Sequence, residues 1–230
     1  MQSRRPGLAY LMSESRPPVK VDIWSDVQCP WCYIGKRRFE KAVASSGVDV
    51  EVEYHSFELS PDTPVGYDGT PADYLMERRG LARPQVDQML ARVTQLAAEE
   101  GLAYDFDHTH QTNTVKAHEL LHYAKARGRQ AEMKEALLQA YFVDGGHVGR
   151  VPDLADLAAS LGFDRDDVVR SLESQEHLPA VKADVRQAGA LGIQGVPFYV
   201  FDGRYGVSGA QPSEMFAEVL TKVAAEEQVA

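Results

Sequence analysis

The feature that most constrains this chain is Cys29-Pro30-Trp31-Cys32, which holds the only two cysteines among its 230 residues. An alternating apolar segment at residues 19–24 precedes it, and an apolar run of helical period follows it. One helical turn brings two such sulfurs within bonding distance, so a C-x-x-C between a strand and a helix predicts a redox pair. Linking cysteines so close in sequence would constrain the unfolded chain little, so we expect their value to be chemical.

The positions of Cys29 and Cys32 on the expected helix give them different roles. At or just before the first turn, Cys29 would face unpaired backbone N–H groups and the positive end of the helix dipole, which favour the thiolate. We therefore predict that Cys29 is the attacking sulfur, with a pKa below about 7.5. Pro30 at the first helical position sacrifices no hydrogen bond, and Cys32, one turn inside, is predicted to be the resolving sulfur.

The two cysteines could instead be two of the four ligands of a zinc ion, and the site would then need two more ligands. The chain has no third cysteine, so these would be histidines, either His108 and His110 or His118 and His122. Zinc-binding C-x-x-C pairs usually lie in tight knuckles rather than between a strand and a long helix. We therefore expect no metal at this site.

The net charge of the chain limits the classes of partner that it can bind. With 34 acidic and 24 basic residues its formal charge is −10, which argues against a nucleic-acid or an anionic-membrane partner. No apolar run approaches the length of a transmembrane helix. Residues 1–17 contain apolar positions, but polar residues interrupt them before a secretory core could form. We expect a flexible N-terminal tail at residues 1–17 and a cytoplasmic protein.

Apolar periodicity predicts the first half of the fold. Alternation indicates strands at residues 19–24 and 48–54, joined by the cysteine-bearing helix, which we expect to end at Gly47. From residue 71 to about residue 192 the apolar period is helical. This stretch is far longer than an ordinary crossover between parallel strands, so it is predicted to be an inserted helical domain at residues 71–192.

Strand signals return in residues 195–209, around a hairpin turn at Asp202-Gly203, and residues 212–225 are predicted to form the last helix. The predicted fold class is therefore α/β, with the order β-α-β, helical insertion, β-β-α. Residues 18–70 and 193–230 would form one discontinuous domain. The expected buried stripe of the last helix is Met215, Phe216, Val219, Leu220 and Val223.

Two further stretches could reach the cysteines. Residues 104–113 are aromatic and polar without a clear period. Such a stretch often faces a cleft, but a surface loop is the default expectation. Three consecutive cations, Lys36, Arg37 and Arg38, follow the cysteines and could stabilise a thiolate. We expect them instead to form a solvated helix face.

The order of elements, with C-x-x-C after the first strand and Val-Pro before the third, resembles the thioredoxin superfamily, and the long insertion resembles its DsbA-like branch. Residues 25–35, 57–61, 195–201 and 207–211 look like the FrnE-like proteins, which are cytoplasmic DsbA-family oxidoreductases. The resemblance covers about residues 19–225. It implies a thioredoxin fold with a large all-helical insertion.

The resemblance also implies residues that contact the substrate. The bond before Pro197 would be cis and would face the reactive sulfur, and Val196 would offer its main-chain N–H and C=O to an extended peptide. Pro30 and Trp31 beside the cysteines would complete a contact surface, to which Tyr33 would either contribute or pack inward.

A buried acid is expected to move protons at the dithiol. Thioredoxins commonly bury one six residues before the first cysteine, and this chain has Ile23 there. Asp26 lies nearer and is the candidate for proton handling at Cys32, although a loop aspartate also commonly bonds its own backbone.

The leading hypothesis is thiol–disulfide exchange by Cys29 and Cys32, acting on a protein or a small molecule that bears a thiol or a disulfide. No bound cofactor is expected, and glutathione or another thiol would be the redox partner. The alternative is a glutathione-dependent isomerase or a kappa-type glutathione transferase, which usually carries serine at the first active-site position. A third possibility is a redox-switched binding module. The oligomeric state stays open, a homodimer included.

Overall fold

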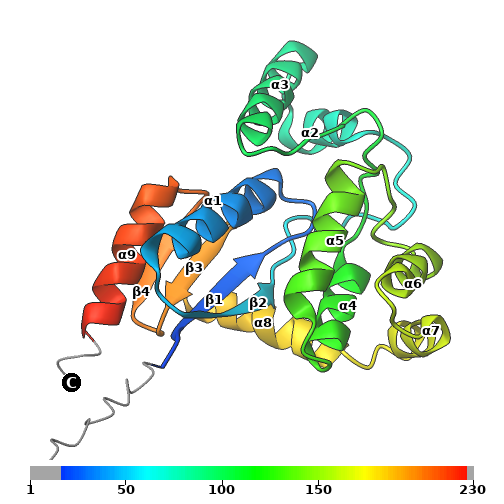
Figure 1. Ribbon diagram of the computed structural model, residues 1–230. Coiled ribbons are helices and arrows are strands. Elements are labelled where there is room, and N and C mark those ends of the chain that lie inside the picture. Colours follow the sequence, from blue (N-terminus) through cyan, green and yellow to red (C-terminus); the bar gives the residue numbers. More distant parts are fainter. Residues whose placement is uncertain (1–16, 227–230) are drawn as a thin grey trace, which may run out of the picture.

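A mixed β-sheet lies at the centre of the computed structural model, which describes residues 17–226 (Figure 1). Its strands are β1 (Val19–Ser25), β2 (Val50–Ser56), β3 (Phe198–Phe201) and β4 (Tyr205–Ser208), in the order β2-β1-β3-β4. Strand β1 is parallel to β2 and antiparallel to β3, and β3 is antiparallel to β4. The predicted fold class is confirmed.

Helices cover both faces of this sheet (Figure 1). Alternate side chains of a strand point to opposite faces, so Val19, Val21 and Ile23 of β1 pack under α1 (Pro30–Ser46) and α9 (Ser213–Glu226). On the other face, Trp24 packs against Ala188 of α8 (Leu178–Ala190). The cysteine-bearing helix thus lies on the sheet with the last helix beside it.

Local sequence explains the limits of α1. Pro30 occupies the first turn, where its missing N–H costs no hydrogen bond. Gly47 ends the helix with a φ of 64°, a left-handed conformation that glycine adopts without steric cost. Both ends match the prediction from sequence.

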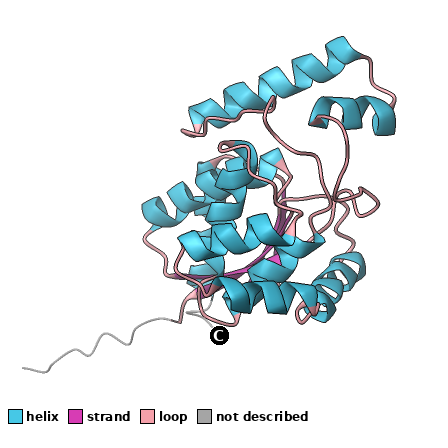
Figure 2. Cartoon of the chain, turned by 90° about the vertical axis from the view of Figure 1, so that its right-hand side faces the viewer, coloured by secondary structure: helices cyan, strands magenta, loops and turns pink. Residues whose placement is uncertain are grey.

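The remaining helices lie between β2 and β3 in the chain. They are α2 (Pro71–Arg79), α3 (Arg83–Glu99), α4 (Val115–Lys125), α5 (Gln130–Phe142), α6 (Val151–Ser160) and α7 (Arg165–Glu173), followed by α8. Helices α2 and α3 stand apart from the others at the top of both views (Figures 1 and 2). Helices α4 to α7 share one apolar core, which includes Tyr33 and Ile34 of α1. Helix α1 therefore lies between two cores.

Some details differ from the sequence prediction. Strand β3 begins at Phe198, just after Pro197, rather than at residue 195. Met215 is exposed and Val219 is only partly buried, because α9 turns the narrower stripe of Phe216, Leu220 and Val223 inward. The prediction for the N-terminal tail falls almost wholly outside the described residues. Among the described helices, none is long and apolar enough to cross a membrane.

Candidate active site

Cys29 and Cys32 lie at the start of α1, and both are thiols with only 3% of their surface exposed. Cys29 is the N-cap residue, with an extended backbone at φ −85° and ψ 112°. The backbone N–H of Cys32 donates to the carbonyl oxygen of Cys29 over 2.9 Å, which closes the first turn. The helix start predicted from the C-x-x-C motif is therefore observed.

Val196 and Pro197 face Cys29 from the loop before β3. Their peptide bond is cis, as the resemblance implied. The Cys29 Sγ donates a hydrogen bond to the carbonyl oxygen of Val196 over 3.3 Å. Gly35 allows this approach, because a Cβ there would lie 2.6 Å from the hydroxyl of Tyr199 and 3.1 Å from Cγ of Pro197. The first turns of α1 and the cis-proline loop are thus in close contact.

A cavity of about 600 Å³ opens beside the cysteines. Cys29, Pro30, Trp31 and Val196 line it on one side, and residues of α2 and α3 line the other, while Cys32 is not part of the lining. The Trp31 side chain is 40% exposed, so its ring is available to a bound molecule. Access to the dithiol from this cavity is therefore through Cys29.

The stretch of residues 104–113 contributes to this cleft, where a surface loop was the default expectation. The hydroxyl of Tyr104 donates to the carbonyl oxygen of Pro30 over 2.7 Å. Phe106 and Gln111 line the cavity, and the Gln111 side-chain amide donates to Gln28 over 3.1 Å. This segment therefore holds the start of α1 in place from the side of the helical insertion.

Asp26 lies fully buried behind the cysteines. Its carboxylate accepts a hydrogen bond of 2.8 Å from the backbone N–H of Leu59, and the Nε2 of His118 lies 3.3 Å from its Oδ1. Burial raises the pKa of Asp26, but His118 and the Leu59 amide more than offset it, so this pKa lies below its usual value. The side chain is therefore charged at neutral pH.

The two thiols titrate as a pair. Burial opposes ionisation of Cys32, but a hydrogen bond from Cys29 and the charge of Lys134 lower its pKa below the usual value. The same hydrogen bond, together with burial, raises the pKa of Cys29 well above its usual value. The prediction of a low pKa at Cys29 is wrong for this geometry. The two thiols therefore share one negative charge once the first proton is lost, and that titration belongs to the pair.

Three polar side chains of α1 that follow the cysteines pack toward α5. Tyr33 is buried and donates to Glu135 over 2.6 Å, so it packs inward. Lys36 is also buried and pairs with Glu135, as does Arg37. A solvated face was the wrong interpretation for Lys36, because Glu135 comes from α5, far away in sequence.

The histidines of the zinc interpretation contact side chains other than the cysteines. His118 contacts Asp26, while His122 lies 2.9 Å from Asp184 and His108 lies 2.7 Å from Asp105. The ring of His110 stacks on another histidine. In the part of the chain that the structure describes, no group of potential metal ligands includes a cysteine.

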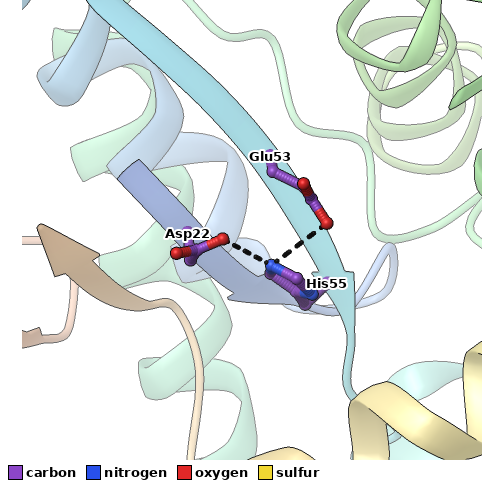
Figure 3. A group of neighbouring side chains, drawn as sticks. All are labelled: Asp22, Glu53 and His55. Atoms are coloured by element: carbon purple, nitrogen blue, oxygen red, sulfur yellow. Dashed lines mark hydrogen bonds and ion pairs between the residues drawn. The ribbon is translucent and has the colours of Figure 1, made fainter. Parts of the chain in front are cut away.

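Asp22, Glu53 and His55 do gather closely enough to hold a cation, with ligand atoms within 4.8 Å of one another (Figure 3). The Nε2 of His55 lies 2.8 Å from Asp22, however, and Lys20 pairs with both carboxylates. Lys125 also pairs with Glu53. Because lysines already neutralise these acids, we interpret the group as an ionic network at the surface of β1 and β2.

A dithiol at the start of α1, facing a cis-proline beside a sheet of this order, defines a thioredoxin-like protein. The helices between β2 and β3 define its DsbA-like class. The chain belongs to the DSBA-like thioredoxin domain family, which matches residues 20–221.

Solved structures agree with this assignment. A probable DsbA oxidoreductase, SCO1869 from Streptomyces coelicolor, is 39% identical with a TM-score of 0.84, over 90% of this chain and 91% of that one. A 2-hydroxychromene-2-carboxylate isomerase is 16% identical with a TM-score of 0.70, over 91% and 98%. The cytosolic disulfide reductase DsbM from Pseudomonas aeruginosa, solved with GSH, is 18% identical with a TM-score of 0.58, over 91% and 98%. The last two likenesses show a shared fold.

Proposed function

We propose that this protein is a thiol–disulfide oxidoreductase that works through Cys29 and Cys32. The observation that carries the proposal is the asymmetry of the pair, because Cys29 lines the cavity beside Val196 and Cys32 does not. An outer sulfur that meets substrate and an inner sulfur that resolves the intermediate are what exchange through a mixed disulfide requires.

The first step needs the negative charge on Cys29. For this step the single negative charge of the pair lies on Cys29 and the remaining proton on Cys32, and the Cys29 thiolate then attacks one sulfur of a substrate disulfide. A mixed disulfide forms on Cys29, and the other substrate sulfur leaves as a thiolate.

The second step needs Cys32 to lose this proton, and Asp26 is the buried base that we propose receives it. The Cys32 thiolate attacks the Cys29 sulfur, the Cys29–Cys32 disulfide forms, and the second substrate sulfur leaves as a thiolate. The substrate disulfide is reduced by two electrons and the protein dithiol is oxidised by two. The same steps in reverse oxidise a substrate dithiol.

We propose that the substrate lies in the cavity against Pro30, Trp31, Val196 and Pro197. The carbonyl oxygen of Val196 is already a hydrogen-bond acceptor for Cys29, and an extended peptide would bond to this backbone as an added strand does. Trp31 would cover an apolar part of the substrate.

The alternative is a glutathione-dependent isomerase or kappa-type transferase acting on a small aromatic substrate. A cavity of about 600 Å³ is large enough for such a ligand, and the relative DsbM was solved with GSH. Cys29, where those enzymes usually have serine, favours exchange. Glutathione or another small thiol would be the redox partner in the leading proposal.

Four finer assignments accompany this proposal. We place the protein in the FrnE-like branch and in the cytoplasm, with no nucleic-acid or membrane partner. We also retain the proposed division into a discontinuous domain at residues 18–70 and 193–230 and a helical insertion at residues 71–192. The last helix of that insertion, α8, nevertheless packs on the sheet.

Reduction of insulin disulfides by dithiothreitol or glutathione tests the function. We expect the purified protein to accelerate it, Cys29→Ser to abolish the acceleration, and Cys32→Ser to accumulate a mixed disulfide visible by mass spectrometry. Thr94→Ser, a mild change in α3, serves as the matched control. Full activity of Cys29→Ser would rule out the mechanism. Conjugation or isomerisation of an aromatic substrate that survives in Cys29→Ser would favour the alternative.

A further inference from the structure

The cavity beside the dithiol has a charge opposite to that of the chain. Two arginines line it, Arg79 at the end of α2 and Arg92 in the middle of α3. Among residues 17–226 no aspartate or glutamate lines it, although the chain has 34 acidic and only 24 basic residues. The space that a substrate of Cys29 would enter is therefore positively charged.

Arg79 and Arg92 have no acidic partner in the described part of the chain. Both residues are exposed and neither makes a salt bridge there, whereas Arg83, at the start of α3, pairs with Asp87 over 2.7 Å. The planar guanidinium of an arginine fits a carboxylate, to which it can donate two parallel hydrogen bonds. The donors of Arg79 and Arg92 are therefore available to an anionic group of a bound molecule.

The period of α3 separates the charges near the site. Met89, Arg92 and Val93 are three or four residues apart, so they share the helix face that lines the cavity of Cys29. The neighbouring face lines a second cavity of about 360 Å³, which Cys29 does not line. The acidic residues around this second cavity are Asp73, Asp87, Asp105 and Asp107. The acids of this region are thus kept apart from the cavity that holds the two arginines.

Apolar side chains surround the two arginines. Trp31, Leu59 and Met89 are between 40% and 51% exposed, and all three line the cavity. Large apolar side chains that are exposed together mark a binding surface. They also lower the local polarity, which strengthens a bond between a guanidinium and a carboxylate because less water competes for it.

The size of the cavity indicates a small molecule. Its volume of about 600 Å³ lies within the range of about 300–1,000 Å³ that is usual for cavities that enclose small ligands. A stable protein partner instead covers a broad surface of about 800 Å² on each side.

We propose that the substrate of this cavity is a small thiol or disulfide that carries carboxylate groups, and that Arg79 and Arg92 bind these carboxylates while the sulfur meets Cys29. The inference rests on the proposed function and names its substrate class. A short acidic peptide that contains cysteine has this chemistry, because it combines a sulfur, apolar methylene groups and terminal carboxylates. The exchange itself follows the steps given above, in which the substrate disulfide takes two electrons from the dithiol.

The test compares glutathione disulfide with the same disulfide after its carboxylates are esterified, which removes only the negative charges. The rate constant for oxidation of the reduced protein is measured with both disulfides by acid quenching and chromatography. In Arg79→Gln and in Arg92→Gln we expect the rate with the acidic disulfide to fall about three- to tenfold, and the rate with the ester to change less than about twofold. Glutamine removes the charge and keeps a good helix propensity. Added salt should weaken the preference of the wild type for the acidic disulfide.

Arg83→Gln is the matched control, because it removes the same charge from the same helix but lies at the second cavity and pairs with Asp87. The ratio of the two rate constants should stay as in the wild type. Equal losses in Arg83→Gln and Arg92→Gln would show that only the net charge matters, and this would overturn the proposal. A loss seen with insulin but not with glutathione disulfide would assign the arginines to a protein substrate and would also overturn it.

S-methylglutathione separates this inference from the proposed function, because it carries the carboxylates but has no thiol to exchange. Isothermal titration calorimetry should show binding to the wild type that weakens about three- to tenfold in Arg79→Gln or Arg92→Gln and stays unchanged in Arg83→Gln. Absent binding, or binding that all three variants leave unchanged, would contradict the carboxylate site. Arginine-dependent binding in a protein that exchanges with neither disulfide would keep the site and overturn the proposed function.

Discussion

Replacing Asp184 by alanine should destabilise the fold more than any surface charge change, because this side chain joins three elements. Its carboxylate accepts hydrogen bonds from the backbone N–H of Ser56 over 2.8 Å, from His55 over 3.0 Å and from His122 over 2.9 Å. Only 7% of Asp184 is exposed. Removing one partner of a buried charged group typically costs about 3–5 kcal/mol, because the remaining donors stay buried without an acceptor.

Thermal unfolding followed by circular dichroism would measure this loss. For a chain of this size about 3–5 kcal/mol corresponds to a fall in Tm of roughly 10 °C. Asp156→Ala is the control, since that side chain is 67% exposed and pairs with Arg165 at the surface. Its effect should stay within about 0.5 kcal/mol. A cost below about 1 kcal/mol for Asp184→Ala would refute the view that this carboxylate is a structural centre.

The pH dependence of the difference provides a second check. Burial raises the pKa of Asp184, but His122, His55 and the Ser56 amide lower it far more, so its folded pKa lies well below the usual value. A depressed pKa contributes stability above the unfolded pKa of about 4 and loses it as the pH falls further. The gap between wild type and Asp184→Ala should therefore narrow below about pH 4.

Two further substitutions test the site. Gly35→Ala should lower the free energy of unfolding by about 1–3 kcal/mol, because the new Cβ would clash with the buried hydroxyl of Tyr199. An unchanged Tm in thermal unfolding would mean that α1 shifts to make room for it. Trp31→Ala should change the free energy of unfolding by less than about 0.5 kcal/mol but raise the KM for insulin several-fold. An unchanged KM would remove Trp31 from the substrate surface.

The sequence predicts well where signals are local. Pro30 and Gly47 limit α1 because their backbone preferences act on adjacent residues. Alternation in residues 19–24 places β1 correctly, since the period of a strand is independent of what covers it. The cis bond at Pro197 follows from the resemblance alone. No local pattern in the chain would have indicated it.

The electrostatics of the site could not be predicted from the sequence in the same way. The helix-dipole argument for Cys29 is local, but burial and the hydrogen bond to Cys32 outweigh it in the folded protein. Lys134 and Glu135 lie about one hundred residues from the cysteines and have no motif spacing to them. A lysine on a helix is usually exposed, so nothing in the sequence distinguishes Lys134 from its neighbours.

The helices between β2 and β3 supply the countercharges for both sides of the sheet. On the side of the dithiol, α5 provides Glu135 for the cations of α1, and α4 brings His118 to Asp26. On the other side, α8 provides Asp184 to β2 and α4. Helices α4 and α5 also share an apolar core with α1. A chain without them would leave buried charges unpaired and α1 half uncovered, so the sheet and the insertion must fold as one unit for the dithiol to keep its charge.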